Sequence, residues 1–488
     1  MAPSFNGVVV YGIFLLLGAG TLFPWNAFIT VNAYYSSRYC GSAFADDYLA
    51  YYGVVFNLFE VVTLVGCVTR GWNYVLVPLH FFVLIFVLTS LSVFLDDISA
   101  GWVFSLTIFS LACVGVLTAL LSGGVFGLGA GFPPKYTQAI MSGQGLAGTV
   151  VSISEIATLW VAGMDDSFCS GQADHNDDRC EDYKVDWAAF AYFAVAVVTL
   201  ASCILAYQVL ESMEITKFYR SIDVNAAAAG AVGAGAGDRG GSGSGSGSSD
   251  EDCADNEKAN VIKEPLLEFV DGNSSGISSV KSSSLDLGDG SPSPSPPLQA
   301  KGDRNGHLSE LLQLVSYEAF SVFFVFLVTL GLFPALTSKI VSTSKCSQGA
   351  SRIQNDLFAP LSFLNYNFFD FLGRIASGRC DLRWWTGRRL LWASVSRLAF
   401  FPLFLLCDVD NSALPTLFNS DVYPVMGMVL FAFSNGLISS LCMMVGPTRV
   451  PEEHRIKTGN IMIGALSAGL MAGSALSFIT LFIATGSF

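Results

Sequence analysis

The sequence carries little charge for its length and lacks the patterns of several protein classes. Charged residues make up 13% of 488 positions and apolar residues 52%, whereas about a quarter of a soluble domain is charged. The four histidines show no metal-ligand spacing, and no nucleophile elbow or phosphate-binding loop is present. Basic residues form no stripe interleaved with aromatic side chains, which argues against nucleic-acid binding. We therefore expect a membrane protein that is not an enzyme and that binds no cofactor or metal.

The N-terminus lacks the pattern of a cleavable signal. Its first apolar stretch follows a start without basic residues and leads into Pro24-Trp25-Asn26 rather than into small residues. We expect this stretch to be the first membrane span. The net charge of −14 reflects acidic residues in connecting segments, such as Asp165 and Asp166, and does not indicate a basic partner.

Long apolar runs predict eleven transmembrane helices, because a hydrocarbon core about 30 Å thick needs about 20 apolar residues per helix. A long segment, 211–312, is rich in Ala, Gly, Ser and Ser-Pro repeats, and such composition predicts disorder. The predicted all-α chain has six helices in 1–210, a disordered cytoplasmic linker in 211–312 and five helices in 313–488. The spans are 8–31, 49–69, 74–95, 102–124, 136–163, 187–209, 316–338, 357–378, 388–407, 422–445 and 458–484.

Basic residues gather in alternate loops, and this sets the expected orientation because lysine and arginine favour the cytoplasmic side. The opposite loops are acidic, although Arg38, Lys339, Lys345 and Arg352 lie there. We expect a cytoplasmic N-terminus and linker, an extracellular C-terminus and a plasma-membrane location. The inside residues are Arg70, Lys135, Lys217, Arg220, Arg379, Arg383, Arg388, Arg389, Arg449, Arg455 and Lys457.

Four cysteines fall in the loops assigned to the outside, where oxidising conditions permit disulfides. Cys169 and Cys180 share one loop and are expected to form one bond. Cys40 with Cys346 would then join the two halves. The alternative is four free thiols.

The two halves show a weak internal repeat. The first predicted span contains LFP at 22–24 and the seventh contains LFP at 332–334. Glycine-rich motifs recur in the fifth span, at 143–148, and in the eleventh, at 459–466. Halves with helix-breaking residues at matching places are typical of transporters of the major-facilitator type, so we expect a pseudo-two-fold 6+5 arrangement. For LFP alone, chance similarity is the alternative.

Three polar residues of the eighth span are candidates for ligand contact. Asn367, Asp370 and Arg374 are spaced by three and four, which places them on one helical face and lets the last two pair. Burying such charges in lipid is costly, so they should face a wet cavity or each other. Arg374 offers donors and Asp370 acceptors that suit hydroxyls or a purine edge. An ion pair that only braces the bundle is the alternative.

Three further residues stand out in the other spans. Glu60 and Glu155 are lone carboxylates at membrane depth, and such groups can relay protons or bond to a neighbouring helix. Trp25 follows Pro24 and could present its indole to a planar ligand, or it could belong to the core.

Several motifs together resemble the equilibrative nucleoside transporter family. They cover both predicted halves in order and omit only the linker and the outer loops. The motifs are GTLFPWN at 20–26, YTQAIMSGQGLAG at 136–148, NFFDFLGR at 367–374, RLAFFPLFLLC at 397–407, FAFSNG at 431–436 and GP at 446–447.

The resemblance implies eleven spans and alternating access between two bundles. It implies that Trp25 and Ile29 line a central site, with Phe59 or Glu60 at the corresponding place in the second span. Asn367, Asp370 and Arg374 would contact or organise the sugar and base. The apolar walls would come from Phe333 and Leu470.

One departure from the family pattern concerns the base. Many members place Gln ahead of Gly-x-x-Phe-Gly-Leu in the fourth span, where this chain has Ser122. A hydroxyl reaches less far, so base selectivity would differ. Glu60, Glu155 and the general pattern are similar to protozoan members, some of which couple transport to protons.

The sequence therefore predicts a carrier of nucleosides, with purine nucleosides favoured, that works across the lipid bilayer by alternating access. Transport would be facilitative or coupled to protons. A nucleobase carrier of the same fold and a membrane receptor without transport activity are the alternatives.

Overall fold

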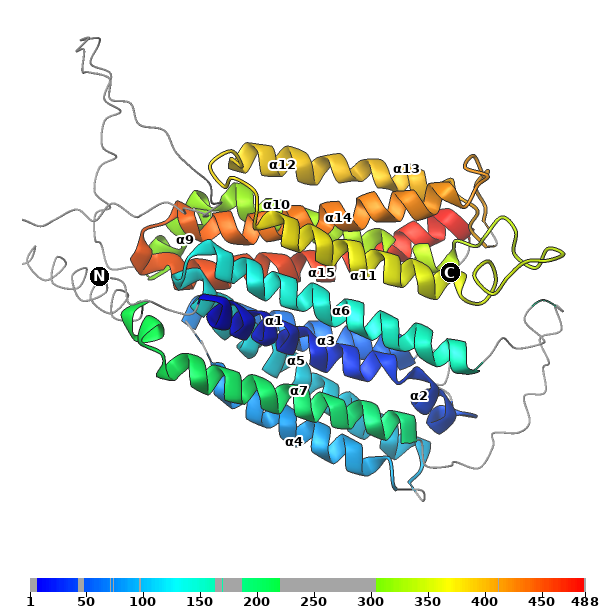
Figure 1. The fold of residues 1–488 in the computed structure, drawn as a ribbon, viewed down its shortest axis with the longest axis horizontal. Coiled ribbons are helices and arrows are strands. Elements are labelled where there is room, and N and C mark those ends of the chain that lie inside the picture. Colours follow the sequence, from blue (N-terminus) through cyan, green and yellow to red (C-terminus); the bar gives the residue numbers. More distant parts are fainter. Residues whose placement is uncertain are drawn as a thin grey trace, which may run out of the picture. The chain divides into compact units, whose positions relative to one another are not determined.

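The computed structural model describes residues 7–42, 48–70, 72, 74–95, 98–162, 169, 187–219, 304–410 and 412–486. Within these ranges the long elements are all helices, and the expected all-α fold is confirmed (Figure 1). The α-helices are α1 (Gly7–Thr30), α2 (Asn32–Tyr39), α3 (Tyr48–Arg70), α4 (Leu76–Ser92), α5 (Ala100–Gly131), α6 (Pro134–Ala162), α7 (Trp187–Ser212), α9 (Arg304–Leu314), α10 (Ser316–Leu332), α11 (Phe358–Ser377), α12 (Gly387–Ser396), α13 (Phe400–Leu405), α14 (Val422–Val445) and α15 (Arg455–Thr485).

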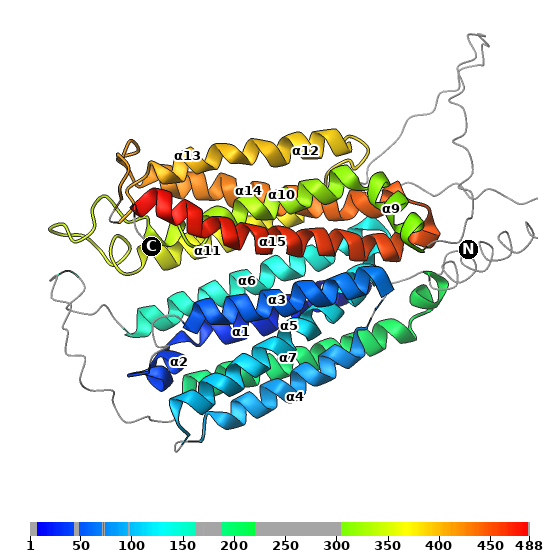
Figure 2. The ribbon, with the colours of Figure 1, turned by 180° about the vertical axis from the view of Figure 1, so that it is seen from behind.

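The helices before and after the linker form one compact unit, made of Met1–Ala229 and Asp303–Phe488. In the N-terminal half, α1 packs on α6, α3 on α5, and α4 on α7. In the C-terminal half, α11 packs on α14 and α10 on α15. The halves meet in two places: α6 contacts α11 and α14, and α15 contacts α3 and α5. Figure 2 shows α15 between α10 and the N-terminal helices.

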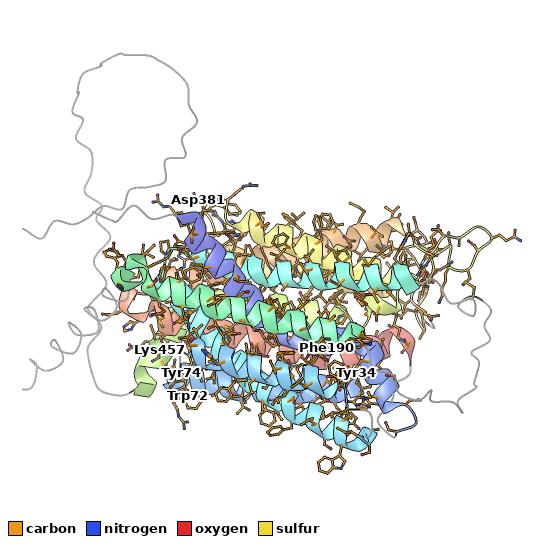
Figure 3. All side chains as sticks on the ribbon, turned by 60° about the horizontal axis from the view of Figure 1, so that its bottom comes forward. Tyr34, Trp72, Tyr74, Phe190, Asp381 and Lys457 are labelled. Carbon is orange, nitrogen blue, oxygen red and sulfur yellow. A yellow bond between two sulfur atoms is a disulfide. The ribbon has the colours of Figure 1, made fainter. Side chains whose placement is uncertain are left out.

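The two ends of this unit are named here by what lies at them. The linker end is where α1 begins, α7 ends and α9 lies, and the loop end is where α2 lies (Figure 1). Side chains in Figure 3 mark the same division. Trp72, Tyr74, Asp381 and Lys457 lie at the linker end, and Tyr34 and Phe190 lie toward the loop end (Figure 3).

Seven of the described helical segments are long and apolar enough to cross a bilayer. Neither α6 nor α11 is among them, because both carry several polar side chains. The chain is therefore an all-helical membrane protein, while the count of eleven spans and the 6+5 division stay predictions. The seven segments are Gly7–Ile29, Tyr51–Arg70, Ala100–Gly131, Ala189–Ser212, Ser316–Lys339, Val422–Arg449 and Glu452–Thr485.

Two predicted segments differ from the structure in their detail. The ninth predicted span, 388–407, is divided into α12, a 3₁₀ turn at Arg397–Ala399, and α13. Pro402 lies just after this turn and has no N–H to continue the helical ladder, which explains the break. The ends of the segment predicted to be disordered are helical, at 214–219 and in α9; its interior lies outside the described residues.

Glycines set the close spacing of the helices around the polar residues. A Cβ on Gly143 of α6 would lie 1.9 Å from the carbonyl oxygen of Leu15 in α1. A Cβ on Gly436 of α14 would lie 1.9 Å from the carbonyl oxygen of Asp370 in α11. Small residues thus let backbones touch, and they fix α6 and α11 firmly within their own halves.

A disulfide and an arginine join the halves at the loop end. Cys169, after α6, bonds to Cys346, before α11. Arg352 donates to the carbonyl oxygens of Leu159, at 2.9 Å, and Trp160, at 3.3 Å. Hydrogen bonding to Asp356 raises the pKa of Arg352 above its ordinary value. These contacts are called the loop-end clasp below.

The predicted disulfide pairing is wrong. Cys169 pairs with Cys346 rather than with Cys180, so Cys346 is not the partner of Cys40. Cys40 is itself disulfide-bonded, and Cys180 lies outside the described residues. The alternative of four free thiols is also wrong. The physical reason is the contact between α6 and α11, which brings together two loops that are distant in sequence.

Candidate functional site

The ion pair expected in the eighth span is formed and buried. Arg374 Nε donates to Asp370 Oδ2 at 2.7 Å, and the two side chains are only 7% and 5% exposed. The spacing of four residues places them one turn apart on α11. A buried pair of this kind needs further hydrogen bonds to offset the loss of water.

Arg374 reaches from α11 across to the N-terminal half. Its Nη1 donates to the carbonyl oxygen of Met141 at 2.9 Å and to Gln144 Oε1 at 3.2 Å. In return, Gln138 Nε2 donates to the carbonyl oxygen of Arg374 at 3.0 Å. Both glutamines lie on α6 and are held by α1: Tyr11 donates to Gln138, and Gln144 donates to Thr21. The guanidinium is therefore positioned by both halves at once.

Asp370 is held on its other side by the C-terminal half. Asn435 Nδ2, from α14, donates to Asp370 Oδ1 at 2.6 Å. Asn435 Oδ1 lies 2.7 Å from Thr329 Oγ1 of α10. Thr329 in turn accepts from Arg397 at 2.8 Å. Both carboxylate oxygens of Asp370 are thus engaged.

Asn367 also contributes to the contact between α11 and α6, one helical turn from Asp370 toward the loop end. Its Nδ2 donates to Ser152 Oγ at 2.8 Å, and its carbonyl oxygen accepts from Thr149 at 3.1 Å. The glycine motif at 143–148 explains the close approach. A Cβ on Gly148 would lie 2.5 Å from Asn367 Oδ1, while Gly143 faces α1. The motif therefore serves two helix contacts with different glycines.

A second group of predicted residues lies along α3, which contacts α1 at Phe56 and α15 at Glu60. The ring of Trp25 stacks on Phe56 of α3, with centroids 4.5 Å apart. Glu60 lies one turn further along α3, is buried, and accepts from Ser467 Oγ of α15 at 3.4 Å. Leu470 follows Ser467 by three residues and is partly buried against the main core cluster.

The structure distinguishes the two residues offered for the second span. Phe59 is 42% exposed, whereas Glu60 is 7% exposed and turned toward α15. Ser122, in α5, is buried, and Ile29, in α1, is half-buried. Glu155 is half-buried in the loop-end part of α6.

Phe333 lies within the C-terminal half rather than between the halves. Its ring stacks on Tyr366 with centroids 4.0 Å apart and meets Phe363 edge to face. It belongs to the aromatic cluster around Phe404 and Phe431. Through Tyr366, Phe333 supports the helix turn that precedes Asp370.

A cavity of about 340 Å³ lies beside α11, lined mainly by apolar residues of α11 and α14. Its α11 residues, including Leu361, Asn365 and Phe369, lie on roughly the opposite side of the helix from Asp370 and Arg374, by the helical period of 3.6 residues. We therefore do not place the transport site there.

Several members of the polar network were not singled out from the sequence. Gln138 and Gln144 fall inside the quoted motif of α6, and Asn435 falls inside FAFSNG, but only their contacts reveal their partners. Thr329 has no distinctive pattern. The available signal was a polar side chain within an apolar span, and many residues of the helices share that signal.

Comparison with a solved structure identifies the fold class. The proton:xylose symporter of the major facilitator superfamily, bound to 6-bromo-6-deoxy-D-glucose, matches with a TM-score of 0.51 at 12% identity. The match covers 96% of this chain and 88% of that one. The fold is therefore major-facilitator-like, as expected.

Sequence comparison then gives the family. The family model described as "Nucleoside transporter" matches residues 108–482. Equilibrative nucleoside transporter 1 of Rattus norvegicus is 30% identical, over 98% of this chain and 98% of its own length. Equilibrative nucleoside transporter 2 of Homo sapiens is 28% identical, over 96% of this chain and 95% of its own length. The chain belongs to the nucleoside transporter family, and the resemblance seen in its motifs is confirmed.

Proposed function

We propose that this protein carries nucleosides across the bilayer, with the ligand held between its two halves near Asp370 and Arg374. The observation that carries this proposal is the buried ion pair whose arginine bonds to both halves. A ligand inserted here would meet groups from α1, α6 and α11 together. Binding can therefore be coupled to the relative position of the halves.

The chemistry of the pair suits a nucleoside. A guanidinium presents donors in a fixed fork for the oxygens of a ribose or the acceptors of a purine. The Asp370 carboxylate accepts hydrogen bonds from hydroxyls, and Asn367 offers both a donor and an acceptor nearby. Trp25, already stacked on Phe56, supplies an aromatic face for a planar base. Ile29 and Leu470 would provide apolar walls.

We assign the choice between bases to Ser122, on the α5 side of the proposed site. Ser122 is buried and its hydroxyl is shorter than the glutamine of many family members. We propose that purine nucleosides are preferred, because a larger base can span the extra space. A nucleobase carrier of the same fold would not need the ribose contacts, and a receptor would bind without transport.

Transport would proceed by alternating access, with the halves rocking about the ligand. Glu60 is the carboxylate proposed to carry a proton, because it is buried between α3 and α15 and is not ion-paired among the described residues. Glu155 is the second candidate. The linker end is assigned to the cytoplasm, and the plasma membrane is the proposed location. No catalytic step, cofactor or metal is part of this proposal.

Uptake of labelled adenosine by Asp370→Asn and Arg374→Lys tests the site. Each should lower uptake by about tenfold or more. Asp370→Asn leaves the buried charge of Arg374 uncompensated. Arg374→Lys keeps the charge but removes the planar fork of donors that reaches Asp370, Met141 and Gln144 together. Asp356→Asn is a matched control, since it makes the same change in the partly exposed pair Arg352–Asp356. Uptake is normalised to protein at the cell surface.

Normal uptake by both site variants would refute the site assignment. Competition by inosine, uridine and hypoxanthine separates a nucleoside carrier from a nucleobase carrier. Flux into proteoliposomes that contain the purified protein separates a carrier from a receptor.

A further inference from the structure

A second buried arginine, Arg397, lies at the far end of the network from Arg374. It is 1% exposed and stands in the 3₁₀ turn between α12 and α13. Its Nη1 donates to Ser434 Oγ at 2.7 Å and to the carbonyl oxygen of Phe431 at 2.9 Å. Its guanidinium carbon lies 4.6 Å from the centre of the Phe431 ring. No carboxylate among the described residues lies within ion-pair distance of it.

The one bond of Arg397 that leads toward the site runs through Thr329. Arg397 Nη2 donates to Thr329 Oγ1 at 2.8 Å. A hydroxyl has a single proton, and the acceptors near that of Thr329 include Asn435 Oδ1, at 2.7 Å, and the carbonyl oxygen of Val325, at 2.8 Å. The Tyr366 hydroxyl also hydrogen-bonds with Thr329. Because the cationic Arg397 donates to the oxygen of Thr329, the Thr329 hydroxyl becomes a stronger donor toward Asn435.

The direction of that bond fixes the amide of Asn435. When Asn435 Oδ1 accepts from Thr329, its Nδ2 must face Asp370 and donate to it, as it does at 2.6 Å. A flipped amide would place Oδ1 against the carboxylate, which repels it. The chain Arg397–Thr329–Asn435–Asp370 is called the relay below.

We propose that Arg397 is a positioning residue for nucleoside binding that acts through the relay to hold Asp370, and through it Arg374, in the binding geometry. The inference rests on the proposed site at Asp370 and Arg374. It assigns Arg397 no contact with the ligand. It also gives a physical reason for an arginine buried on the outer helices of the C-terminal half, far from the α6 contact.

The relay can be cut without changing shape or charge. Thr329→Val replaces the hydroxyl by a methyl, and Thr329→Ser keeps the hydroxyl. Ser434→Ala is the matched control, because it also removes one hydrogen bond of Arg397 but leaves the relay intact. The measurement is adenosine uptake as KM and as maximal rate per transporter at the surface.

Thr329→Val should raise the KM at least fivefold with the maximal rate per transporter within twofold of the wild type. Thr329→Ser and Ser434→Ala should each leave the KM within twofold. If Thr329→Val does not reach the membrane, Thr329→Cys carries the same expectation, since sulfur is a weak acceptor.

The proposal is overturned if Ser434→Ala raises the KM as much as Thr329→Val, or if Thr329→Val lowers only the amount of surface protein. Either result would make Arg397 a brace. This failure is distinct from failure of the proposed site. If the proposed site is wrong, Asp370→Asn transports normally. If only the relay proposal is wrong, Asp370→Asn still has low uptake.

Discussion

The halves of this transporter meet along two contacts of different chemistry. In the first, called the polar seam, α6 faces α11 and the loop before α11 through directional bonds from end to end. Gln138 bonds to the backbone of Arg374 near the linker end, Ser152 bonds to Asn367 in the middle, and Arg352 bonds to Leu159 at the loop end. Such bonds fix distance and angle together.

The second contact, called the glycine seam, joins α15 to α5 and α3. A Cβ on Gly459 of α15 would lie 2.7 Å from the carbonyl oxygen of Phe126, and one on Gly464 would lie 3.5 Å from Val68. The close approach is that of Gly459, in the linker-end part of α15, whereas the distance at Gly464 is an ordinary van der Waals contact. Toward the loop end the same helix exposes apolar side chains, among them Phe478 and Ile479 at 58% and 56%.

The difference predicts unequal roles in transport. Opening the glycine seam would break the bond from Ser467 to Glu60, whereas breaking the polar seam would leave a larger number of polar groups unpaired in lipid. The polar seam should therefore hold the ligand and act as the pivot. The glycine seam should be the contact that opens and closes.

Among the variants that compare the two seams, the largest effect is expected from filling the glycine seam. Gly459→Ala would bring a methyl against the backbone of Phe126 and 2.9 Å from the Cβ of Ala130. The helices must then move apart, at a cost of about 1–3 kcal/mol. We expect adenosine uptake per surface transporter to fall by about tenfold, since each 1.4 kcal/mol is a factor of ten.

Gly131→Ala is the control for that change. It makes the same Gly→Ala change, at the last residue of α5, but its new Cβ would lie at an ordinary distance of 3.5 Å from Ile456. Uptake should stay within about twofold of the wild type. Equal loss in both variants would show that the glycine seam is not especially sensitive to close approach.

The carboxylates Asp370 and Glu60 also differ between the two seams. This difference predicts an effect of intermediate size on nucleoside uptake. Asp370 in the polar seam is ion-paired, whereas Glu60 beside the glycine seam accepts one described bond, from Ser467. A carboxylate without a cationic partner can gain and lose a proton as the seam opens. Wild-type uptake should rise severalfold when the outside is made acidic, because protons then move inward with the nucleoside.

Glu60→Gln should abolish that stimulation and keep nucleoside exchange at equal pH on both sides. Glu155→Gln should retain the stimulation if Glu60 is the coupling residue. If neither a proton gradient nor a protonophore changes uptake by the wild type, the proposal of proton coupling is wrong, and Glu60 and Glu155 are structural residues.

Local pattern was enough to predict an all-helical membrane protein and the buried pair. Spacing of four residues in an apolar span placed Asp370 and Arg374 on one face, and the structure confirms that they pair. Their role toward a ligand stays a prediction. The 3₁₀ turn at Arg397 was missed because Pro402 lies near the end of a run whose composition still reads as one span.

Partners distant in sequence could not be predicted in the same way. The contact of Gln144 with Arg374 spans 230 residues and that of Asn435 with Asp370 spans 65. Nothing in one helix specifies which neighbour its polar face will meet. The disulfide was mispaired for the same reason, because loop membership was used in place of the contact between α6 and α11.

The smallest expected effect tests whether the polar seam depends on its covalent bond. Cys346→Ser removes the bond to Cys169, but Arg352 still donates to Leu159 and Trp160 at the same end. We therefore expect uptake within about twofold of the wild type, and the same for Arg352→Gln alone, which removes an interaction that is partly exposed.

The double variant Cys346→Ser/Arg352→Gln should lose more than the product of the two single losses, because both groups tie the same two segments and each compensates for the other. Uptake and the melting temperature of purified protein measure this coupling. A variant pair is preferable to a reductant, since Cys40 is disulfide-bonded as well. Independent, multiplicative losses would mean that the loop-end clasp is two unrelated contacts, and the pivot would then have to lie closer to Arg374.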